Sequence, residues 1–462
     1  MSTKVLVFLN VLVLAGLALI VGIGRDEPLR PSVEQALNQR FPLVAPEDNI
    51  YVGLAGLPYL EDGDVVTAGK KYYQNAPKPD NAAKLKQVYD FSYANPCQKA
   101  ETANCLDQIE AESEALMASY EKNRAIVERY LQVQKMPLYV NNSSYTSFVP
   151  QLMPLIGASR LIGAKALLDI RRGDVEGGLA ALEADLAFLR RIGQSSGLGL
   201  MDLTVILSLV NTHLTEISKI IEDDRIDLTG REDRLRKILE LDFNFGSMMT
   251  AFLTTEKRHH LQSVGLLFER PSPWPQSFLE NLQNRFFLFL TRKNLTRNMA
   301  AARFDQDIRE MKALPLLDFP KYLARRLARG PVSILASNSR IKALYDKYGL
   351  LFFKNYGGER FAAIAEIDHV RYAALITDVI VYSRLVRAQL ELRLMPERPE
   401  DVSAALAQLG PETWNSYTGQ PFEWDHDQNV ILAERALREP AMVRGKPSSP
   451  DLLKAAVPLS RP

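Results

Sequence analysis

Cysteine is scarce in this chain. Of 462 residues only two are cysteine, Cys97 and Cys105, and both lie in the segment NPCQKAETANCLD. Two thiols with no nearby His cannot supply the four ligands of a structural zinc site, and they exclude a multi-disulfide scaffold. In an oxidising compartment the pair would form one disulfide that closes a short loop. Two unrelated thiols are the alternative.

An excess of one charge sign is also absent. The 56 basic and 55 acidic side chains give a formal net charge of +1, so no global field attracts nucleic acid. The composition, 47% hydrophobic and 24% charged, is that of an ordinary globular protein. We expect a chain with a sizeable core, organised as several domains or as one helical array, that does not bind nucleic acid.

Polar residues are nearly missing from one stretch close to the N-terminus. The run VLVFLNVLVLAGLALIVGI begins at Val5 and ends at Ile23, with Asn10 as its only strongly polar side chain. At about 1.5 Å per residue, this run matches the roughly 30 Å thickness of the bilayer hydrocarbon. We predict a single transmembrane helix. Gly22 and Gly24 would also fit a signal-peptide cleavage site, but the run is long for a signal peptide, which favours an uncleaved signal-anchor.

The orientation of this anchor follows from the few charges around it. Lys4 precedes the span, whereas Arg25 follows it and is offset by Asp26 and Glu27. This asymmetry places the N-terminus in the cytoplasm. We therefore expect a single-pass protein of the bacterial inner membrane whose body lies in the periplasm.

Strand-like alternation is rare, and apolar residues mostly recur at spacings of three and four, as on helix faces. One such face starts at Cys105 and continues past residue 130. The segment RRGDVEGGLAALEADLAFLRR joins two predicted helices, 151–172 and 174–192, at Gly173. This pair resembles a tetratricopeptide hairpin, although no period of about 34 residues continues on either side. Small residues, including Gly157 and Gly163, would let one helix approach another closely.

The predicted fold class is mostly α, an irregular helical-hairpin array that is partly tetratricopeptide-like, with a small C-terminal β-hairpin. PFEWD and NVILA, which flank the polar turn HDQ, predict that hairpin. A further helix is predicted to begin with a capping box of Ser32 and Gln35. The expected regions are an anchor (1–26), an irregular N-terminal region (27–104), a helical body (105–400), a small element with the hairpin (401–437) and a proline-rich disordered tail (438–462).

Metal binding is the sharpest chemical candidate in the sequence. Glu256 precedes His259 by three residues, and Glu366 precedes His369 by three, so each pair would share one helix face. Two such helices are half of the ligand set of a carboxylate-bridged di-metal bundle. With 55 acidic residues this spacing also arises by chance, and both segments suit solvated helix faces.

Other motif matches are better explained by local structure. GQSSG, residues 193–197, has the letters of a nucleophile elbow around Ser195, but a predicted helix rather than a strand precedes it. The turn WDHDQN lacks the sixth-position Gly and the twelfth-position Glu of a calcium loop. We therefore predict no catalytic residue and no cofactor.

The chain resembles an uncharacterised family of N-terminally membrane-anchored, helical envelope proteins of Gram-negative bacteria. The resemblance rests on DNIYVGLAGL, on the Cys97 and Cys105 pair, on RRGDVEGGLAALEADLAFLRR and on NSYTGQPFEWD. It implies an architecture and a compartment, and it assigns no catalytic residue. The sequence thus favours a non-enzymatic protein-binding or scaffolding module of the envelope with an unknown protein partner, and an envelope metalloenzyme using the two Glu-x-x-His helices is the alternative.

Overall fold

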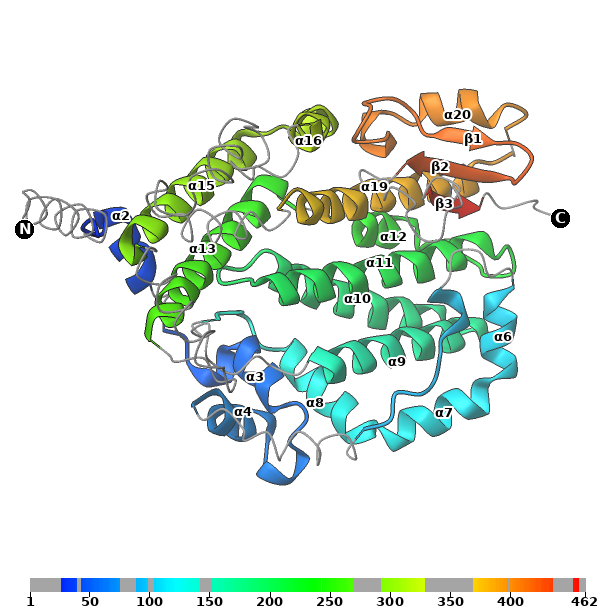
Figure 1. Cartoon of the computed structure of the whole chain (residues 1–462). Coiled ribbons are helices and arrows are strands. Elements are labelled where there is room, and N and C mark those ends of the chain that lie inside the picture. Colours follow the sequence, from blue (N-terminus) through cyan, green and yellow to red (C-terminus); the bar gives the residue numbers. More distant parts are fainter. Residues whose placement is uncertain are drawn as a thin grey trace, which may run out of the picture. The chain divides into compact units, whose positions relative to one another are not determined.

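A computed structural model describes residues 26–39, 43–74, 89–98, 104–141, 152–241, 243–269, 292–328, 369–397, 399–434 and 452–456. These residues form 15 α-helices and one small antiparallel sheet (Figure 1), which confirms the predicted mostly-α class. The chain divides into two compact units. The first unit comprises Met1–Arg40, Leu253–Glu310 and Arg325–His369, and the second comprises Phe41–Phe252, Met311–Ala324 and Val370–Pro462. The predicted membrane span from Val5 to Ile23 lies outside the described residues.

The core of the second unit is a stack of three long helices (Figure 1). They are α9 (Leu152–Arg171), α10 (Val175–Gly193) and α11 (Leu200–Glu222), each packed against the other two. Gly173 turns the chain between α9 and α10 with φ 97°, which a residue without a Cβ adopts at little cost. Asp174 then caps α10 by accepting a hydrogen bond from the Gly177 N–H at 2.9 Å. The predicted hairpin is confirmed, while its membership of a repeat array stays a prediction.

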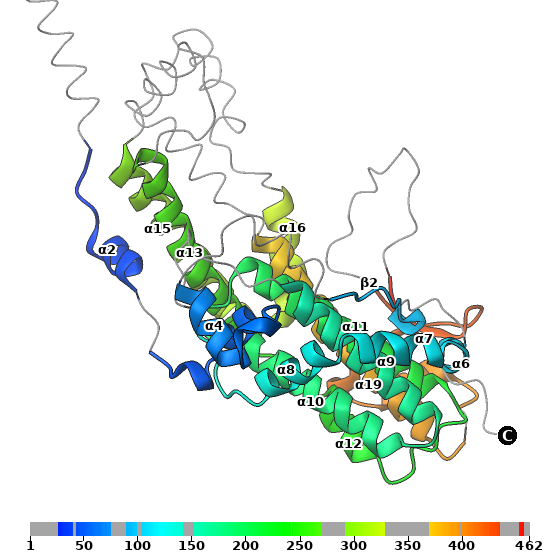
Figure 2. The same cartoon turned by 90° about the horizontal axis from the view of Figure 1, so that it is seen from below.

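Three shorter helices follow the length of α9, as the view from below shows (Figure 2). They are α6 (Cys105–Ala111), α7 (Ser113–Lys122) and α8 (Arg124–Gln134). The sequence predicts a single continuous face here, but the helix breaks twice, the second time at Asn123. The Asn123 amide donates to the Ser119 and Asp90 carbonyls and accepts from the Asp90 N–H. These bonds divert the chain, because a polar side chain that bonds to backbone competes with the helix.

The N-terminal part of the second unit is more regular than its sequence predicts. α3 (Ile50–Gly56) and α4 (Val65–Gln74) pack against each other, next to the 3₁₀ turns η1 (Pro46–Asp48) and η2 (Leu60–Asp62). Every residue of α3 is buried. Because α3 is apolar on all sides, it shows no amphipathic period, and periodicity does not reveal it. A further 3₁₀ turn, η3 (Pro96–Gln98), carries Cys97.

The C-terminal part of the second unit carries the sheet. It also contains most of α19 (His369–Leu394), α20 (Val402–Gln408) and the 3₁₀ turn η6 (Pro411–Thr413). Earlier segments of the same unit contribute α12 (Glu232–Leu239) and the 3₁₀ turn η4 (Leu316–Asp318). β1 (Glu423–Asp425) and β2 (Val430–Glu434) form the predicted hairpin, which is confirmed. β3 (Leu452–Ala456) pairs with β2 and thereby corrects the prediction of disorder at these residues. Its alternate residues Leu453 and Ala455 are buried, and their apolar face explains why this part of the tail folds.

The first unit has a small core of its own. Val33 and Ala36 of α2 (Pro31–Asn38) pack with Leu261 of α13 (Phe245–Glu269) and with Ala300 and Ala301 of α15 (Lys293–Ala313). The predicted short helix at Ser32 is present, but Arg30 occupies the N-cap without a side-chain bond. Ser32 therefore lies in the first turn and does not form the predicted capping box. α13, α15 and α16 (Phe319–Ala328) each continue from one unit into the other.

Candidate functional site

A polar cavity of about 420 Å³ lies in the second unit at the C-terminal end of α11. Three segments that are far apart in sequence meet there: the start of α6, the turn after α11, and the β1–β2 turn with the end of β3. The residues that line the cavity are Asn104, Cys105, Leu106, Asp107, Lys219, Glu222, Asp223, Asp224, Arg225, Gln428, Asn429 and Ala456. We call this cavity the cleft. Most of these residues carry charged or amide side chains, which can form hydrogen bonds and ion pairs with a bound group.

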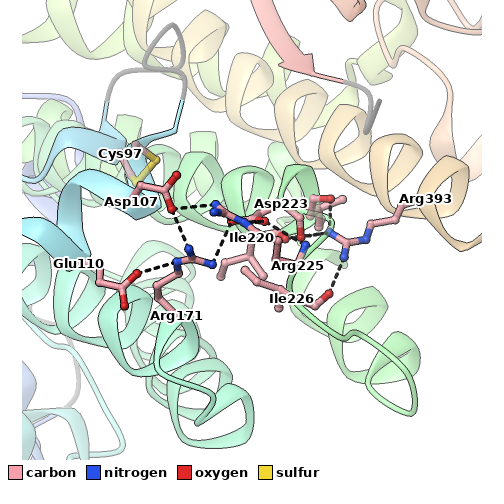
Figure 3. A network of polar contacts seen from close by, with 11 residues as sticks. Cys97, Asp107, Glu110, Arg171, Ile220, Asp223, Arg225, Ile226 and Arg393 are labelled. Atoms are coloured by element: carbon pink, nitrogen blue, oxygen red, sulfur yellow. Dashed lines mark hydrogen bonds and ion pairs between the residues drawn. A yellow bond between two sulfur atoms is a disulfide. The ribbon is translucent and has the colours of Figure 1, made fainter. Parts of the chain in front are cut away.

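The α6 wall of the cleft is held by a disulfide. Cys97 in η3 is bonded to Cys105, the first residue of α6, which confirms the predicted pairing. Both cysteines are buried. η3 also packs against α11, so the disulfide connects the start of α6 to the stack (Figure 3). The position of Asp107, two residues into α6, depends on this connection.

Two arginines join α6 to the turn after α11 (Figure 3). Arg171, the last residue of α9, lies 2.8 Å from Asp107 and 3.0 Å from Glu110. Arg225 contacts Asp107 at 2.9 Å and Asp223 at 2.7 Å. Burial alone would raise the pKa of Asp223, but hydrogen bonds from Arg225 outweigh it and hold that pKa below its ordinary value. Asp223 is thus charged at neutral pH. The start of α6, the end of α9 and the turn after α11 are joined in one ionic network.

The turn after α11 is fixed from the opposite side by Arg393 of α19. Its guanidinium donates to the carbonyls of Ile220 at 3.1 Å and Asp223 at 2.9 Å, and it also donates to those of Ile221 and Ile226. These groups include terminal carbonyls of α11 that have no partner within the helix. A cation at a helix C-terminus also offsets the negative end of the helix dipole. The turn that carries Arg225 is therefore held in place by α19 (Figure 3).

A second constellation, which spacing did not reveal, is buried inside the helical stack. His213 of α11 lies with its Nε2 2.7 Å from Asp185 Oδ2 and its Nδ1 2.6 Å from Glu216 Oε2. All three side chains are fully buried. Ser159 of α9 donates to Asp185 at 2.6 Å, and Tyr130 of α8 donates to it as well. We call Ser159, Asp185, His213 and Glu216 the buried histidine cluster.

The charge state of this cluster follows from its geometry. Burial alone would lower the pKa of His213, but attraction to Glu216 and hydrogen bonds to both carboxylates raise it to about 10. Burial would raise the pKa of Asp185, yet the hydrogen bonds from His213, Ser159 and Tyr130 bring it below its ordinary value. Burial raises the pKa of Glu216 more than His213 lowers it. His213 is therefore an imidazolium at neutral pH, and both of its nitrogens donate.

Ser159, His213 and Asp185 are spaced like a Ser–His–acid catalytic triad, since Ser159 Oγ lies 3.0 Å from His213 Nε2. A triad His must accept the serine proton, whereas this His is already protonated. Ser159 also points its proton at Asp185 rather than at His213. With every member buried, no substrate reaches the hydroxyl. The cluster is a structural ion network that ties α9, α10 and α11 together, and Tyr130 links it to α8.

Two glycines of α9 let neighbouring segments approach closely, and Gly163 makes room for Glu216. A Cβ on Gly163 would lie 2.4 Å from Glu216 Oε2, and a Cβ on Gly157 would lie 2.2 Å from the Phe91 ring. Asn95, four residues after Phe91, donates to Glu216 at 2.8 Å. The predicted close approach at the small residues of α9 is thus realised, by α11 on one side and by the extended segment before η3 on the other.

The predicted metal ligands are only partly within the described residues. Glu256 is largely buried and His259 is half-buried on α13, while Glu366 lies outside the described residues. His369 Nδ1 lies 3.1 Å from Asp307, which also pairs with Arg326. Across the described ranges, no group of three or more His, Cys, Asp or Glu side chains could hold a metal ion. The four-residue set therefore stays a prediction.

For GQSSG and WDHDQN, the structure agrees with the local explanations given above. Ser195 follows α10 and donates to the Ile192 carbonyl at 2.5 Å, so GQSSG is a helix-terminating loop. The Asp425 carboxylate accepts from the backbone N–H groups of Asp427 and Gln428, both at 3.0 Å, as expected for a tight turn. In the described part of the chain, α11 alone is long and apolar enough to cross a bilayer, and most of it is buried against its neighbours.

Comparison with protein-family models, curated proteins and solved structures finds no match to this chain. The resemblance to anchored envelope proteins is therefore still a prediction.

Proposed function

We propose that this protein is a non-enzymatic binding module of the bacterial cell envelope, held in the inner membrane by its N-terminal helix, with its body in the periplasm. It binds a partner polypeptide in the cleft. The buried disulfide between Cys97 and Cys105 supports the oxidising compartment, because disulfides persist there and are rare in the cytosol. The apolar run from Val5 to Ile23 supports the anchor.

The cleft is the observation that carries the binding role. Its wall comes from α6, from the turn after α11 and from the sheet, and each of the first two is fixed by a strong local device, the disulfide and the Arg393 carbonyl bonds. A site held in advance loses little conformational entropy when a partner binds. The wall offers amide and carboxylate groups and, in its described residues, no nucleophile beside a base, which favours recognition over chemistry.

The charge of the wall indicates which partner segment fits. Four carboxylates line the cleft, those of Asp107, Glu222, Asp223 and Asp224, against the two cations Lys219 and Arg225. Asp224 is exposed at the mouth. A segment that brings a basic side chain would balance the remaining negative charge, and such complementarity favours specific association.

Site-specific photocrosslinking in intact cells tests this proposal. A photoreactive amino acid at Asp224 or at Gln428, both exposed at the cleft, should yield the same crosslinked protein reproducibly. The matched control is Asp233 on α12, whose side chain is 99% exposed. Charge reversal by Asp224→Lys should reduce the yield at Gln428, whereas Asp233→Lys should not. Equal yields from the cleft positions and from Asp233, or no crosslinked protein at all, would count against the cleft as the binding site.

A further inference from the structure

The residues directly after the predicted membrane span are bonded to a helix far away in sequence. Asp26 accepts hydrogen bonds from the backbone N–H groups of Asn294 at 2.7 Å and Leu295 at 3.0 Å. These groups belong to the first turn of α15, where N–H donors have no partner within the helix. Asp26 thus acts as an N-terminal cap supplied by a separate segment, and it offsets the positive end of the α15 dipole.

Asn298, one turn further along α15, strengthens the same connection. Its carboxamide accepts from the Arg30 N–H at 3.0 Å and donates to Glu27 at 2.6 Å and to the Pro28 carbonyl at 3.0 Å. We call these bonds of residues 26–30 to α15 the staple. α2 follows at once and packs on α15 and α13 through Val33 and Ala36 (Figure 1). The chain after the span is therefore built into the first unit and is not a free linker.

The staple sets how far the first turn of α15 can lie from the bilayer. Three peptide units separate Ile23 from Asp26, and at most about 3.6 Å is covered per residue. The reach is thus about 11 Å, a few ångströms more than the roughly 5–8 Å of the headgroup layer on one side of a bilayer. If residues 5–23 span the membrane, the N-terminal end of α15 must lie at the membrane surface.

The charges at this end of the first unit fit anionic lipid. Asp26 and Glu27 keep their negative charges, because the staple bonds them to neutral N–H groups. Arg30, Lys293 and Arg297 on the same two segments bring three positive charges, so these five side chains carry a net charge of +1. Juxtamembrane Lys and Arg side chains attract anionic headgroups. We infer that the staple and the first turns of α15 form a membrane-contact surface for anionic phospholipid headgroups. This inference rests on the proposed N-terminal anchor.

Spin-label depth measurements on the full-length protein test the inference. The protein is reconstituted into vesicles of phosphatidylcholine and phosphatidylglycerol in equal amounts, and into pure phosphatidylcholine. Labels are placed at Ser32→Cys, which reports on the anchor, at Lys293→Cys, which reports on α15, and at Asp233→Cys in the second unit as an aqueous reference. Depth is measured from collisions with oxygen, which enters lipid, and with a water-soluble nickel complex.

We expect the labels at positions 32 and 293 to lie at headgroup depth and the label at position 233 to read as aqueous. Position 293 should lie deeper with phosphatidylglycerol, and the variant Arg30→Gln/Arg297→Gln should lose that lipid dependence. An aqueous reading at 293 together with headgroup depth at 32 would overturn the inference but leave the anchor intact. Aqueous readings at both positions would also overturn the inference, and failure of the protein to float with the vesicles would overturn the anchor. Equal depth in the two lipids would refute the role of anionic headgroups.

Discussion

A protonated histidine between two carboxylates is an unusual residue to bury, and its partners explain why His213 is tolerated. Each ring nitrogen donates to an acid, and Asp185 accepts further bonds from Ser159 and Tyr130. Buried charges cost free energy unless they are paired and hydrogen-bonded. The cost of removing one member is therefore larger than the net contribution of the intact network.

Replacement of His213 should destabilise the fold strongly. The variant His213→Gln removes the cation that is hydrogen-bonded to both Asp185 and Glu216, and we expect a loss of about 3–5 kcal/mol in the free energy of unfolding. Urea denaturation followed by circular dichroism measures this loss. The matched control is His426→Gln, because the His426 side chain is 91% exposed, and it should leave the midpoint unchanged. A His213→Gln midpoint equal to that of the wild type would refute the ionic description of the cluster.

The contribution of His213 should also depend on pH in a defined direction. Its pKa rises from the ordinary 6.5 to about 10 in the folded state, so its stabilising effect is complete below pH 6.5 and is lost as the pH rises through 10. The lowered pKa of Asp185 adds stability that is lost on acidification through and below the ordinary value of 3.8. The raised pKa of Glu216 acts in the opposite sense, favouring folding at acid pH. The difference in unfolding free energy between wild type and His213→Gln should therefore narrow from pH 6.5 to 10, and a constant difference across that range would contradict the assignment.

Gly163 gives a steric test of the same cluster. In Gly163→Ala the new methyl group would meet Glu216 at 2.4 Å, so we expect a loss of about 1–3 kcal/mol from overpacking. Gly193→Ala is the matched control, because a Cβ there meets its nearest neighbours at 3.4 Å, an ordinary contact distance. Thermal unfolding of both variants compares them directly. The clash is absent if Gly163→Ala proves as stable as Gly193→Ala.

Residue-level prediction found the disulfide but not the buried histidine cluster. Cys97 and Cys105 are the only cysteines, so their pairing followed from composition and compartment. His213 shares one face of its helix with the Leu, Val and Ile residues of LSLVNTHLTEISKII. A titratable side chain on the apolar face of a helix signals a buried group that needs a partner. The partner Asp185 comes from another helix, and no spacing in the sequence identifies it.

At the scale of elements, local patterns predicted the structures that local forces determine. The α9–α10 hairpin has its Gly173 turn and its Asp174 cap in one short segment. The β1–β2 hairpin is also formed by residues that are close together in sequence. The break at Asn123 depends on Asp90, and β3 depends on pairing with β2 across a long connection. These two features arise from tertiary contacts, which periodicity does not contain. The cleft also arises from tertiary contacts, because three segments that are far apart in sequence form its wall.

The disulfide should stabilise α6 in particular. Its two cysteines are eight positions apart, and a loop of this length predicts a loss of about 2–3 kcal/mol in Cys97→Ala/Cys105→Ala on the chain-entropy model. Urea denaturation measures the global effect. Hydrogen exchange should show faster exchange at α6 amides and unchanged exchange at α12, which does not contact the bond. Unchanged protection of α6 would mean that its packing on α9 alone positions Asp107.

At the scale of the whole molecule, the two proposals assign different tasks to the two units. The first unit, with the staple, fixes the chain at the membrane, and the second unit carries the cleft. Both tasks require the same topology, in which residues 5–23 span the bilayer and the remaining chain enters an oxidising compartment. The neutral overall charge is compatible with this division, since the lipid contact uses a local group of basic side chains.

Cell fractionation combined with thiol trapping tests this topology most directly. Full-length protein is separated into membrane, periplasmic and cytoplasmic fractions. Because both cysteines are buried, free thiols are alkylated in denaturant after an acid quench. We predict that the protein is recovered in the inner-membrane fraction, that Cys97 and Cys105 resist alkylation until a reductant is added, and that external protease degrades the body in spheroplasts. Recovery of the full-length chain in the soluble cytoplasmic fraction, with both thiols alkylated, would contradict the account.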